Sequence, residues 1–265
     1  MSQSGSFGDL RIRVISAIAL LVLGGGAVWL GGAVFLALLA LAGGLMIWEL
    51  IRMMAPESSR AVQIGLGIAG AAVVLRAGLG FAGASALILV VPSLLGTAFV
   101  SKDKQVFGAY ALAIVVAVVS LGVVRSDFGL LMTIWLILVV VASDVGGYFF
   151  GRILGGAKIL PRISPKKTWS GTLGGWLLAA AVGWGFSTGG NVGGGLVWLS
   201  VLVAVAAQIG DVVESAIKRR TGVKDSSRLI PGHGGLLDRF DALIGAGLFV
   251  MVWQAVVGLP VGEAL

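Results

Sequence analysis

A series of long apolar stretches dominates the chain, and polar residues interrupt it only briefly. A helix needs about 20 apolar residues to cross roughly 30 Å of hydrocarbon. By that criterion the sequence predicts nine membrane-spanning segments, at approximately 14–30, 33–51, 61–77, 81–100, 106–124, 128–150, 171–188, 196–217 and 241–259. Transmembrane β-strands would instead alternate in stretches of about ten residues. We therefore expect an all-α polytopic integral membrane protein.

The composition excludes several other classes of protein. Hydrophobic residues make up 58% of the chain, charged residues 12%, and the mean hydropathy is +1.04, which rules out both a soluble domain and a disordered chain. The absence of cysteine excludes disulfides, thiolate metal sites and cysteine nucleophiles. The single histidine, His233, cannot build a multi-histidine zinc site.

The expected topology explains much of the net charge of +7. Cations gather in the connections on one side of the nine predicted helices: Arg11, Arg13, Arg52, Arg60, Lys102 and Lys104. The other side has only Arg76 and Arg125 in its connections. By the positive-inside rule the first side is cytoplasmic, together with the N-terminus and the polar loops 151–170 and 218–240. The lipid bilayer is therefore an expected partner, and nucleic acid is not.

The two parts of the chain differ in chemistry. Residues 1–140 contain few ionisable groups apart from those at segment ends, such as Glu49 and Arg76, and we expect this part to be a membrane scaffold. Residues 141–265 bring acids, cations and hydroxyls into and between the apolar segments. We expect the second part to be the catalytic region.

Two aspartates lie within otherwise apolar segments, Asp144 in the sixth and Asp211 near the cytoplasmic end of the eighth. Such charges are costly in a membrane helix, so a functional role is expected, with a buried structural salt bridge as the alternative. Asp211, Glu214, Ser215 and Lys218 follow one another at i, i+3, i+4 and i+7, which predicts a single helix face. A solvated helix end is a better explanation for Glu214 than for Asp211.

The stretch 215–241 interleaves cations with acids and turn-forming glycines immediately before the ninth segment. Attraction to a lipid surface would need only Lys and Arg. Its glycines permit sharp turns and can present amide N–H groups to phosphate. Asp238 and Asp241 stand three residues apart and can share a helix face, although helix capping alone also favours acids at this position.

This stretch resembles the signature of the phosphatidate cytidylyltransferases, also called CDP-diacylglycerol synthases. The matching residues are Ser215, Lys218-Arg219, Lys224-Asp225, Ser227, Pro231, His233-Gly234-Gly235, Asp238-Arg239 and Asp241. A second block is similar to the same family at Ser143-Asp144, Tyr148, Gly151-Arg152, Ser164-Pro165-Lys166-Lys167-Thr168, Gly171 and Gly174-Gly175. One departure is Ser170, where many members carry Glu, so no catalytic role is assigned to that position.

The resemblance implies that CTP and phosphatidic acid give CDP-diacylglycerol and pyrophosphate in an Mg²⁺-dependent inner-membrane enzyme. It points to Asp211 and Asp238 as the first metal ligands, with Asp144 next, followed by Asp241 and Asp225. Hard carboxylate oxygens suit Mg²⁺, and a second cation is left open. The attacking lipid phosphate is already ionised near neutral pH, so no strong general base is required.

The remaining site residues are assigned on the same grounds. Those expected in catalysis, besides the two aspartates, are Lys218, Arg219, Lys224, His233 and Arg239. Those expected in substrate binding are Arg152, Ser164, Lys166, Lys167, Thr168, Ser215, Asp225, Gly234 and Gly235. The sequence does not divide the cations between CTP and the lipid phosphate. Ser164 and Thr168 either bind phosphate or start a helix, and His233 is expected in an exposed turn.

Two other functions compete with this one. A CTP-dependent polyprenol or phytol kinase would transfer the terminal phosphate instead, and the complete signature argues against it. A membrane transporter would place acids near the midplane in two halves of the chain, whereas here they gather at cytoplasmic helix ends. The small-residue helices permit a homodimer without selecting an interface. A bacterial inner membrane is the expected location, with the active site on the cytoplasmic side.

Overall fold

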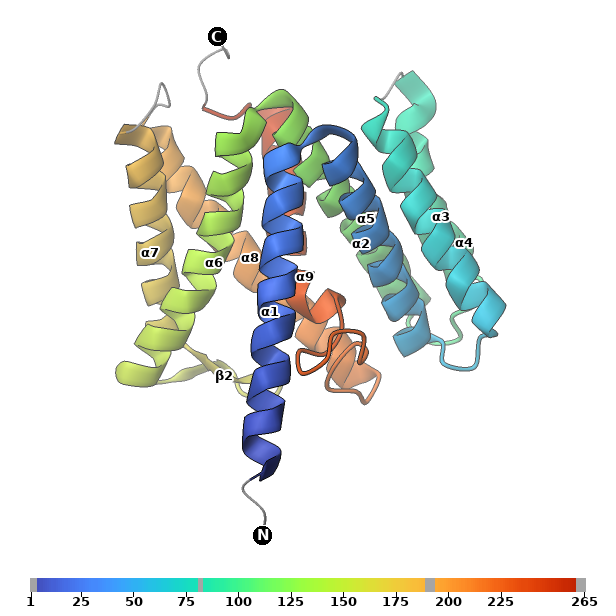
Figure 1. The fold of residues 1–265 in the computed structure, drawn as a ribbon, viewed down its shortest axis with the longest axis horizontal. Coiled ribbons are helices and arrows are strands. Elements are labelled where there is room, and N and C mark those ends of the chain that lie inside the picture. The colour runs from blue at the N-terminus through green and yellow to red at the C-terminus, as the bar shows by residue number, and fades with distance from the viewer. Residues whose placement is uncertain (1–3, 81–82, 189–193, 261–265) are drawn as a thin grey trace. The chain divides into compact units, whose positions relative to one another are not determined.

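The computed structural model describes residues 4–80, 83–188 and 194–260, which form helices and one small hairpin (Figure 1). In chain order the elements are α1 (Ser4–Leu30), α2 (Gly32–Met54), α3 (Arg60–Gly78), the 3₁₀ helix η1 (Gly83–Val90), α4 (Val91–Thr97), α5 (Lys104–Asp127), α6 (Gly129–Ile153), β1 (Lys158–Leu160), β2 (Ser164–Thr168), α7 (Trp169–Thr188), α8 (Gly195–Arg220) and α9 (Leu237–Val256).

Helical structure occurs in every segment that the sequence predicts to be helical. By length and composition, seven helices within the described residues can cross a membrane: α1, α2, α3, α5, α6, α8 and α9. Many of their large apolar side chains are exposed, as lipid-facing side chains must be, including Leu21, Trp29 and Trp198. The prediction of an all-α polytopic membrane protein is confirmed.

The remaining two predicted spans differ from a long apolar helix. The segment predicted at 81–100, whose residues 81 and 82 lie outside the described part, forms η1 and then α4, with Pro92 in the first turn of α4. Proline lacks an N–H group and is tolerated in the first turn of a helix, so Pro92 marks a new start. The second of these two segments forms α7, a helix of 20 residues. Its many Gly, Ser and Thr residues make it less apolar than the seven helices that can cross a membrane.

The chain divides into two compact units. Unit 1 contains Met1–Gly122 and Arg220–Phe240, and unit 2 contains Val123–Arg219 and Asp241–Leu265. This division is based on how the segments pack together. The predicted division into a scaffold and a catalytic region is based instead on where the ionisable residues lie along the chain. The chemical division therefore stays a prediction.

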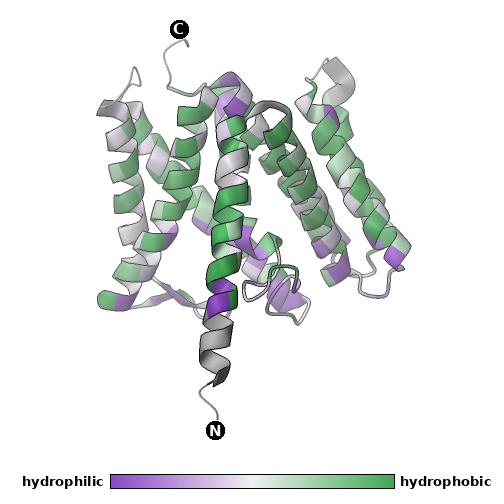
Figure 2. Ribbon diagram, in the orientation of Figure 1, coloured by the Kyte–Doolittle hydropathy of each residue, from purple (hydrophilic) through white to green (hydrophobic). Residues whose placement is uncertain are grey.

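In unit 1, the loop between α8 and α9 (residues 221–236) packs against helices from the first half of the chain. The Ser16 hydroxyl of α1 lies 3.1 Å from the Pro231 carbonyl oxygen, and Glu49 of α2 accepts hydrogen bonds from this loop. Arg220, just before the loop, forms a 3.3 Å ion pair with Asp103, just before α5. Figure 2 shows hydrophobic residues along the helices and hydrophilic ones at their ends and in this loop.

In unit 2, the predicted loop 151–170 contains an antiparallel hairpin between α6 and α7. Lys158 of β1 lies opposite Thr168 of β2, and Leu160 lies opposite Ser164. The hairpin leads directly into α7 and brings Lys167 beside the C-terminal half of α8.

The helices α8 and α9 cross closely at two glycines. A Cβ atom at Gly210 would lie 2.8 Å from the Gly245 backbone nitrogen and would collide with the Asp241 carbonyl oxygen. Because only a hydrogen fits there, the two helix backbones can approach directly beside Asp211 and Asp241. This crossing therefore sets the positions of two of the predicted metal ligands.

We expect Gly210→Ala to lower the stability of the solubilised protein by about 1–3 kcal/mol, since the added methyl group forces the two backbones apart. The matched control is Gly185→Ala on α7, where nothing lies within 4 Å of an added Cβ atom. Thermal unfolding in detergent, followed by circular dichroism, should show a lower midpoint for the first variant only. Equal midpoints for both variants would contradict a tight crossing.

Candidate active site

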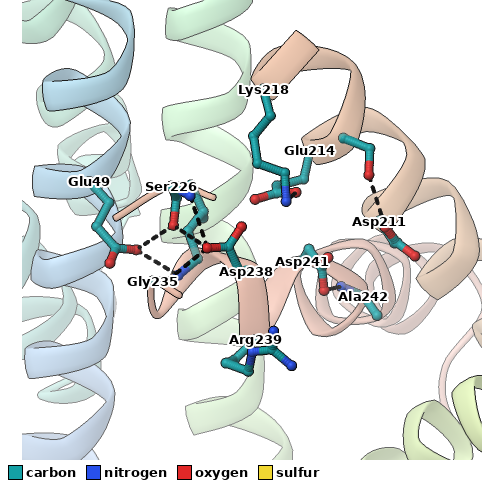
Figure 3. A network of polar contacts seen from close by, with 12 residues as sticks. Glu49, Asp211, Glu214, Lys218, Ser226, Gly235, Asp238, Arg239, Asp241 and Ala242 are labelled. Atoms are coloured by element: carbon teal, nitrogen blue, oxygen red, sulfur yellow. Dashed lines mark hydrogen bonds and ion pairs between the residues drawn. The ribbon is translucent and has the colours of Figure 1, made fainter. Parts of the chain in front are cut away.

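Asp238 lies in the first turn of α9, in unit 1, where the loop folds back onto its carboxylate. Its Oδ2 atom accepts hydrogen bonds from the Gly235 amide at 2.8 Å, the Ser226 amide at 2.9 Å and the Ser226 hydroxyl at 3.0 Å (Figure 3). The positive end of the helix dipole favours an acid at this place. The structure thus shows the local role at the helix start that the sequence leaves open, and the functional role of Asp238 stays a prediction.

Glu49 of α2, which is fully buried, lies beside this group and is the main residue that sequence reasoning missed (Figure 3). Its Oε1 atom accepts from the Ser227 hydroxyl at 2.6 Å and the Leu236 amide at 2.9 Å. Its Oε2 atom accepts from the Leu237 amide at 2.6 Å and lies 3.3 Å from the Ser226 hydroxyl. The available signal was an acid that precedes the last two apolar residues of the predicted segment 33–51.

The turn that carries His233 is built on two glycines with positive φ, Gly232 at 77° and Gly234 at 83°. His233 is half-buried rather than exposed, because its Nδ1 atom lies 2.9 Å from the Ser16 hydroxyl of α1. Arg239 donates from Nε to the His233 carbonyl oxygen at 3.1 Å. The turn is thus held from α1 and from α9, while Lys224 and Asp225 on the same loop are exposed.

In unit 2, the stripe predicted along the eighth segment is confirmed on α8. The Ser215 hydroxyl donates to Oδ1 of Asp211 at 3.2 Å, and Lys218 forms a 2.5 Å ion pair with Glu214. Glu214 is fully buried, so its interpretation as part of a solvated helix end is wrong. Arg219, next along the helix, is exposed.

The hairpin supplies a cation to Asp211. The Lys167 ammonium lies 2.6 Å from Oδ2 of Asp211 and donates to the Gln208 carbonyl oxygen at 3.3 Å. The salt bridge considered from the sequence therefore exists, but it is not buried, because the two side chains keep 23% and 29% of their surface exposed. Both groups stay accessible to a ligand.

The other predicted residues of the hairpin region take different positions. Lys166 is exposed and Ser164 is half-buried, and both lie on β2. Arg152, on the last turn of α6, donates to the Tyr148 hydroxyl at 2.6 Å, with its guanidinium 5.8 Å from the centre of that ring. Thr168 is buried, and its hydroxyl accepts from the Gly171 amide at 3.2 Å. That geometry is an N-cap, so Thr168 starts α7.

Unit 2 also brings three carboxylates into electrostatic contact. Asp241 on α9 interacts with Asp211 on α8 and with Asp144 on α6, as well as with Lys218. Asp144 is exposed on α6, and Asp241 accepts from the Ala242 amide at 2.7 Å. Like charges repel one another, so a cation beside them, such as Lys218, lowers their energy.

The carboxylates fit Mg²⁺ by their chemistry. Within the described residues, no group of three acidic or histidine side chains is arranged to hold one metal ion. Mg²⁺ is usually held by only one or two carboxylates, with substrate phosphates and water completing its shell. The donor set therefore suits a metal ion whose remaining positions are filled by phosphate oxygens or water.

Fold and site together define a polytopic membrane protein whose acids and cations can bind phosphates and a divalent metal. The family model described as the cytidylyltransferase family matches residues 11–257, so the chain belongs to this family. The resemblance noted from the sequence is confirmed.

Bacterial relatives that carry the name phosphatidate cytidylyltransferase are similar to part of the chain. The protein of Brucella suis biovar 1 is 45% identical over 147 residues, which cover 53% of this chain and 54% of the relative. That of Helicobacter pylori is 43% identical over 141 residues, covering 49% and 52%. That of Haemophilus influenzae is 37% identical over 177 residues, covering 61% of each chain. The chain thus spans between half and two thirds of the length of these curated relatives.

The cap at Thr168 can be tested by stability. Thr168→Val keeps the shape of the side chain but removes the hydroxyl, and we expect it to cost about 1 kcal/mol, whereas Thr168→Ser keeps the cap. The control is Thr188→Val at the other end of α7, where the hydroxyl is exposed. Thermal unfolding should separate Thr168→Val from the other two variants. If Thr168 served only to bind phosphate, all three midpoints would coincide without ligand.

Proposed function

We propose that this protein transfers the cytidylyl group of CTP to phosphatidic acid, giving CDP-diacylglycerol and pyrophosphate for phospholipid synthesis. A phosphate oxygen of the lipid forms a bond to the α-phosphorus of CTP. The bond from that phosphorus to the oxygen of the β-phosphate breaks, and pyrophosphate leaves with the bonding electron pair. The bacterial relatives with this name support the proposal.

The observation that carries the proposal is the placement of cations directly beside carboxylates of α8. Lys167 of β2 pairs with Asp211, and Lys218 pairs with Glu214 one helical turn away. A substrate with several phosphates needs such cations, and a divalent metal needs such acids. A lipid headgroup and a soluble nucleotide are both able to reach the end of a membrane helix.

The proposal gives each group of residues a role. In unit 2, Lys166, Lys167, Lys218 and Arg219 bind phosphate oxygens, and in unit 1 Lys224 and Arg239 do so. His233 donates a hydrogen bond to a phosphate or to the leaving pyrophosphate.

Asp211 and Asp238 are proposed to hold Mg²⁺, followed by Asp144 and Asp241. A Mg²⁺ ion held by these carboxylates would supply positive charge that offsets the negative charge of the phosphates. Asp211 is oriented for this role by the Ser215 hydroxyl, and Asp238 by the Gly235 and Ser226 amides. Whether a second cation joins can be read from the metal content of the purified protein.

The active site is proposed to face the cytoplasm of a bacterial cell at its inner membrane. In unit 1 the loop of residues 221–236 contacts Ser16, which follows Arg11 and Arg13 on α1. Arg220 pairs with Asp103, which lies beside Lys102 and Lys104. Cations of this kind mark the cytoplasmic side. The small-residue helices also permit a homodimer, which light scattering of the detergent-solubilised protein would detect.

We expect the purified protein to convert CTP and phosphatidic acid into CDP-diacylglycerol and pyrophosphate only with Mg²⁺ present. Asp211→Asn and Asp238→Asn should each lower kcat/KM by at least about a hundredfold, because each removes a proposed metal ligand. The matched control is Asp127→Asn, at an exposed position at the end of α5.

The products separate the competing functions. A polyprenol or phytol kinase would form CDP and a phosphorylated lipid alcohol, and a transporter would leave CTP intact. A folded protein that shows no turnover of CTP dependent on phosphatidic acid would refute the proposed reaction.

A further inference from the structure

Glu49 is a carboxylate of unit 1 with hydrogen bonds to both of its oxygens. It lies inside α2, fully buried, and its two oxygens face four donors from the distant stretch 226–237. A buried charge persists only when hydrogen bonds or cations replace its lost hydration. Glu49 therefore holds this stretch against α2 through its charge.

The same stretch also holds Asp238. Three consecutive backbone amides around the start of α9 are divided between the two acids: the Gly235 amide donates to Asp238, and the Leu236 and Leu237 amides donate to Glu49. Amides at a helix N-terminus have no partner within the helix, so they need such acceptors. A shift of Glu49 would therefore move the backbone that orients Asp238.

The Ser226 hydroxyl connects the two acids directly. It lies 3.3 Å from Oε2 of Glu49 and 3.0 Å from Oδ2 of Asp238, and its single proton serves one of them at a time (Figure 3). A Cβ atom at position 235 would collide with this hydroxyl and lie 2.6 Å from Oε1 of Glu49. The close approach thus requires glycine at that position.

We infer that Glu49 is a positioning residue for Asp238: it fixes the Asp238 carboxylate, through Ser226 and the first amides of α9, in the orientation that binds the divalent metal. The inference rests on the proposed function, in which Asp238 is a metal ligand. It assigns a role in the reaction to a residue of the part that the sequence predicts to be scaffold.

Glu49→Gln is the direct variant. Each oxygen of Glu49 accepts from two donors, so whichever oxygen becomes NH₂ faces donors instead of accepting from them. Ser226→Ala and Ser227→Ala form a matched pair, since each removes one hydroxyl from Glu49 but only Ser226 also contacts Asp238. Glu49→Asp keeps the charge and tests for partial rescue.

The experiment uses the full chain in detergent and two measurements. Binding of Mn²⁺ as a probe is followed by electron paramagnetic resonance without substrates, and the Mg²⁺ concentration for half-maximal activity is measured with CTP and phosphatidic acid. We expect Glu49→Gln and Ser226→Ala to weaken Mn²⁺ binding and to raise the half-saturating Mg²⁺ concentration by about tenfold or more. Glu49→Asp should change both quantities less. Ser227→Ala should keep both within about twofold of the wild-type values.

A purely structural role would lower the melting temperature or the active fraction and leave both metal measurements at their wild-type values, which would overturn the inference. If Glu49→Gln does not fold, Ser226→Ala decides: unchanged Mn²⁺ affinity there refutes the role. Wild-type protein that binds no Mn²⁺ would refute it too. If the wild-type protein binds Mn²⁺ but does not turn over CTP, the proposed reaction is refuted and the role of Glu49 is not. The Mn²⁺ affinities of the variants can then still be compared with that of the wild type.

Discussion

An ionised carboxylate within an apolar membrane protein has to be met by donors or cations, because the hydration it loses is worth several kcal/mol. Glu49 and Glu214 are both fully buried and meet this requirement differently. Glu49 takes four donors from residues 226–237, whereas Glu214 takes the ammonium of Lys218 one helical turn away. In each unit, a buried acid therefore anchors the polar groups around it.

The acids proposed to act on substrates are less enclosed than these anchors. Asp211 keeps part of its surface exposed beside Lys167, and Asp238 is half-buried in the first turn of α9. A partly exposed ion pair contributes little to stability. Lys167 can therefore leave Asp211 to bind a phosphate, and Asp211 can leave Lys167 to bind a metal, with only a small loss of free energy. The two fully buried acids thus hold amides, hydroxyls or an ammonium of the protein itself, and the two partly exposed acids are the ones proposed to meet ligands.

Much of this protein could be predicted from local patterns. The apolar runs predict the helices, and the i, i+3, i+4, i+7 spacing from Asp211 to Lys218 predicts a stripe on α8 that the structure confirms. The sequence does not predict the division of the fourth segment at Pro92. A prediction from the length and hydropathy of a segment takes no account of the N–H group that proline lacks. The burial of Glu214 was missed because spacing along one helix does not show what packs against it.

The sequence by itself determined the all-α membrane fold, the family and the set of polar residues, since these depend on apolar length and on a contiguous signature. Only the tertiary structure decided that Glu49 of α2 caps α9 and that Lys167 of the hairpin pairs with Asp211. Both contacts join residues far apart along the chain, and a donor is matched to an acceptor by distance and direction in space. The spacing of residues within one segment determines neither the distance nor the direction between groups of different segments.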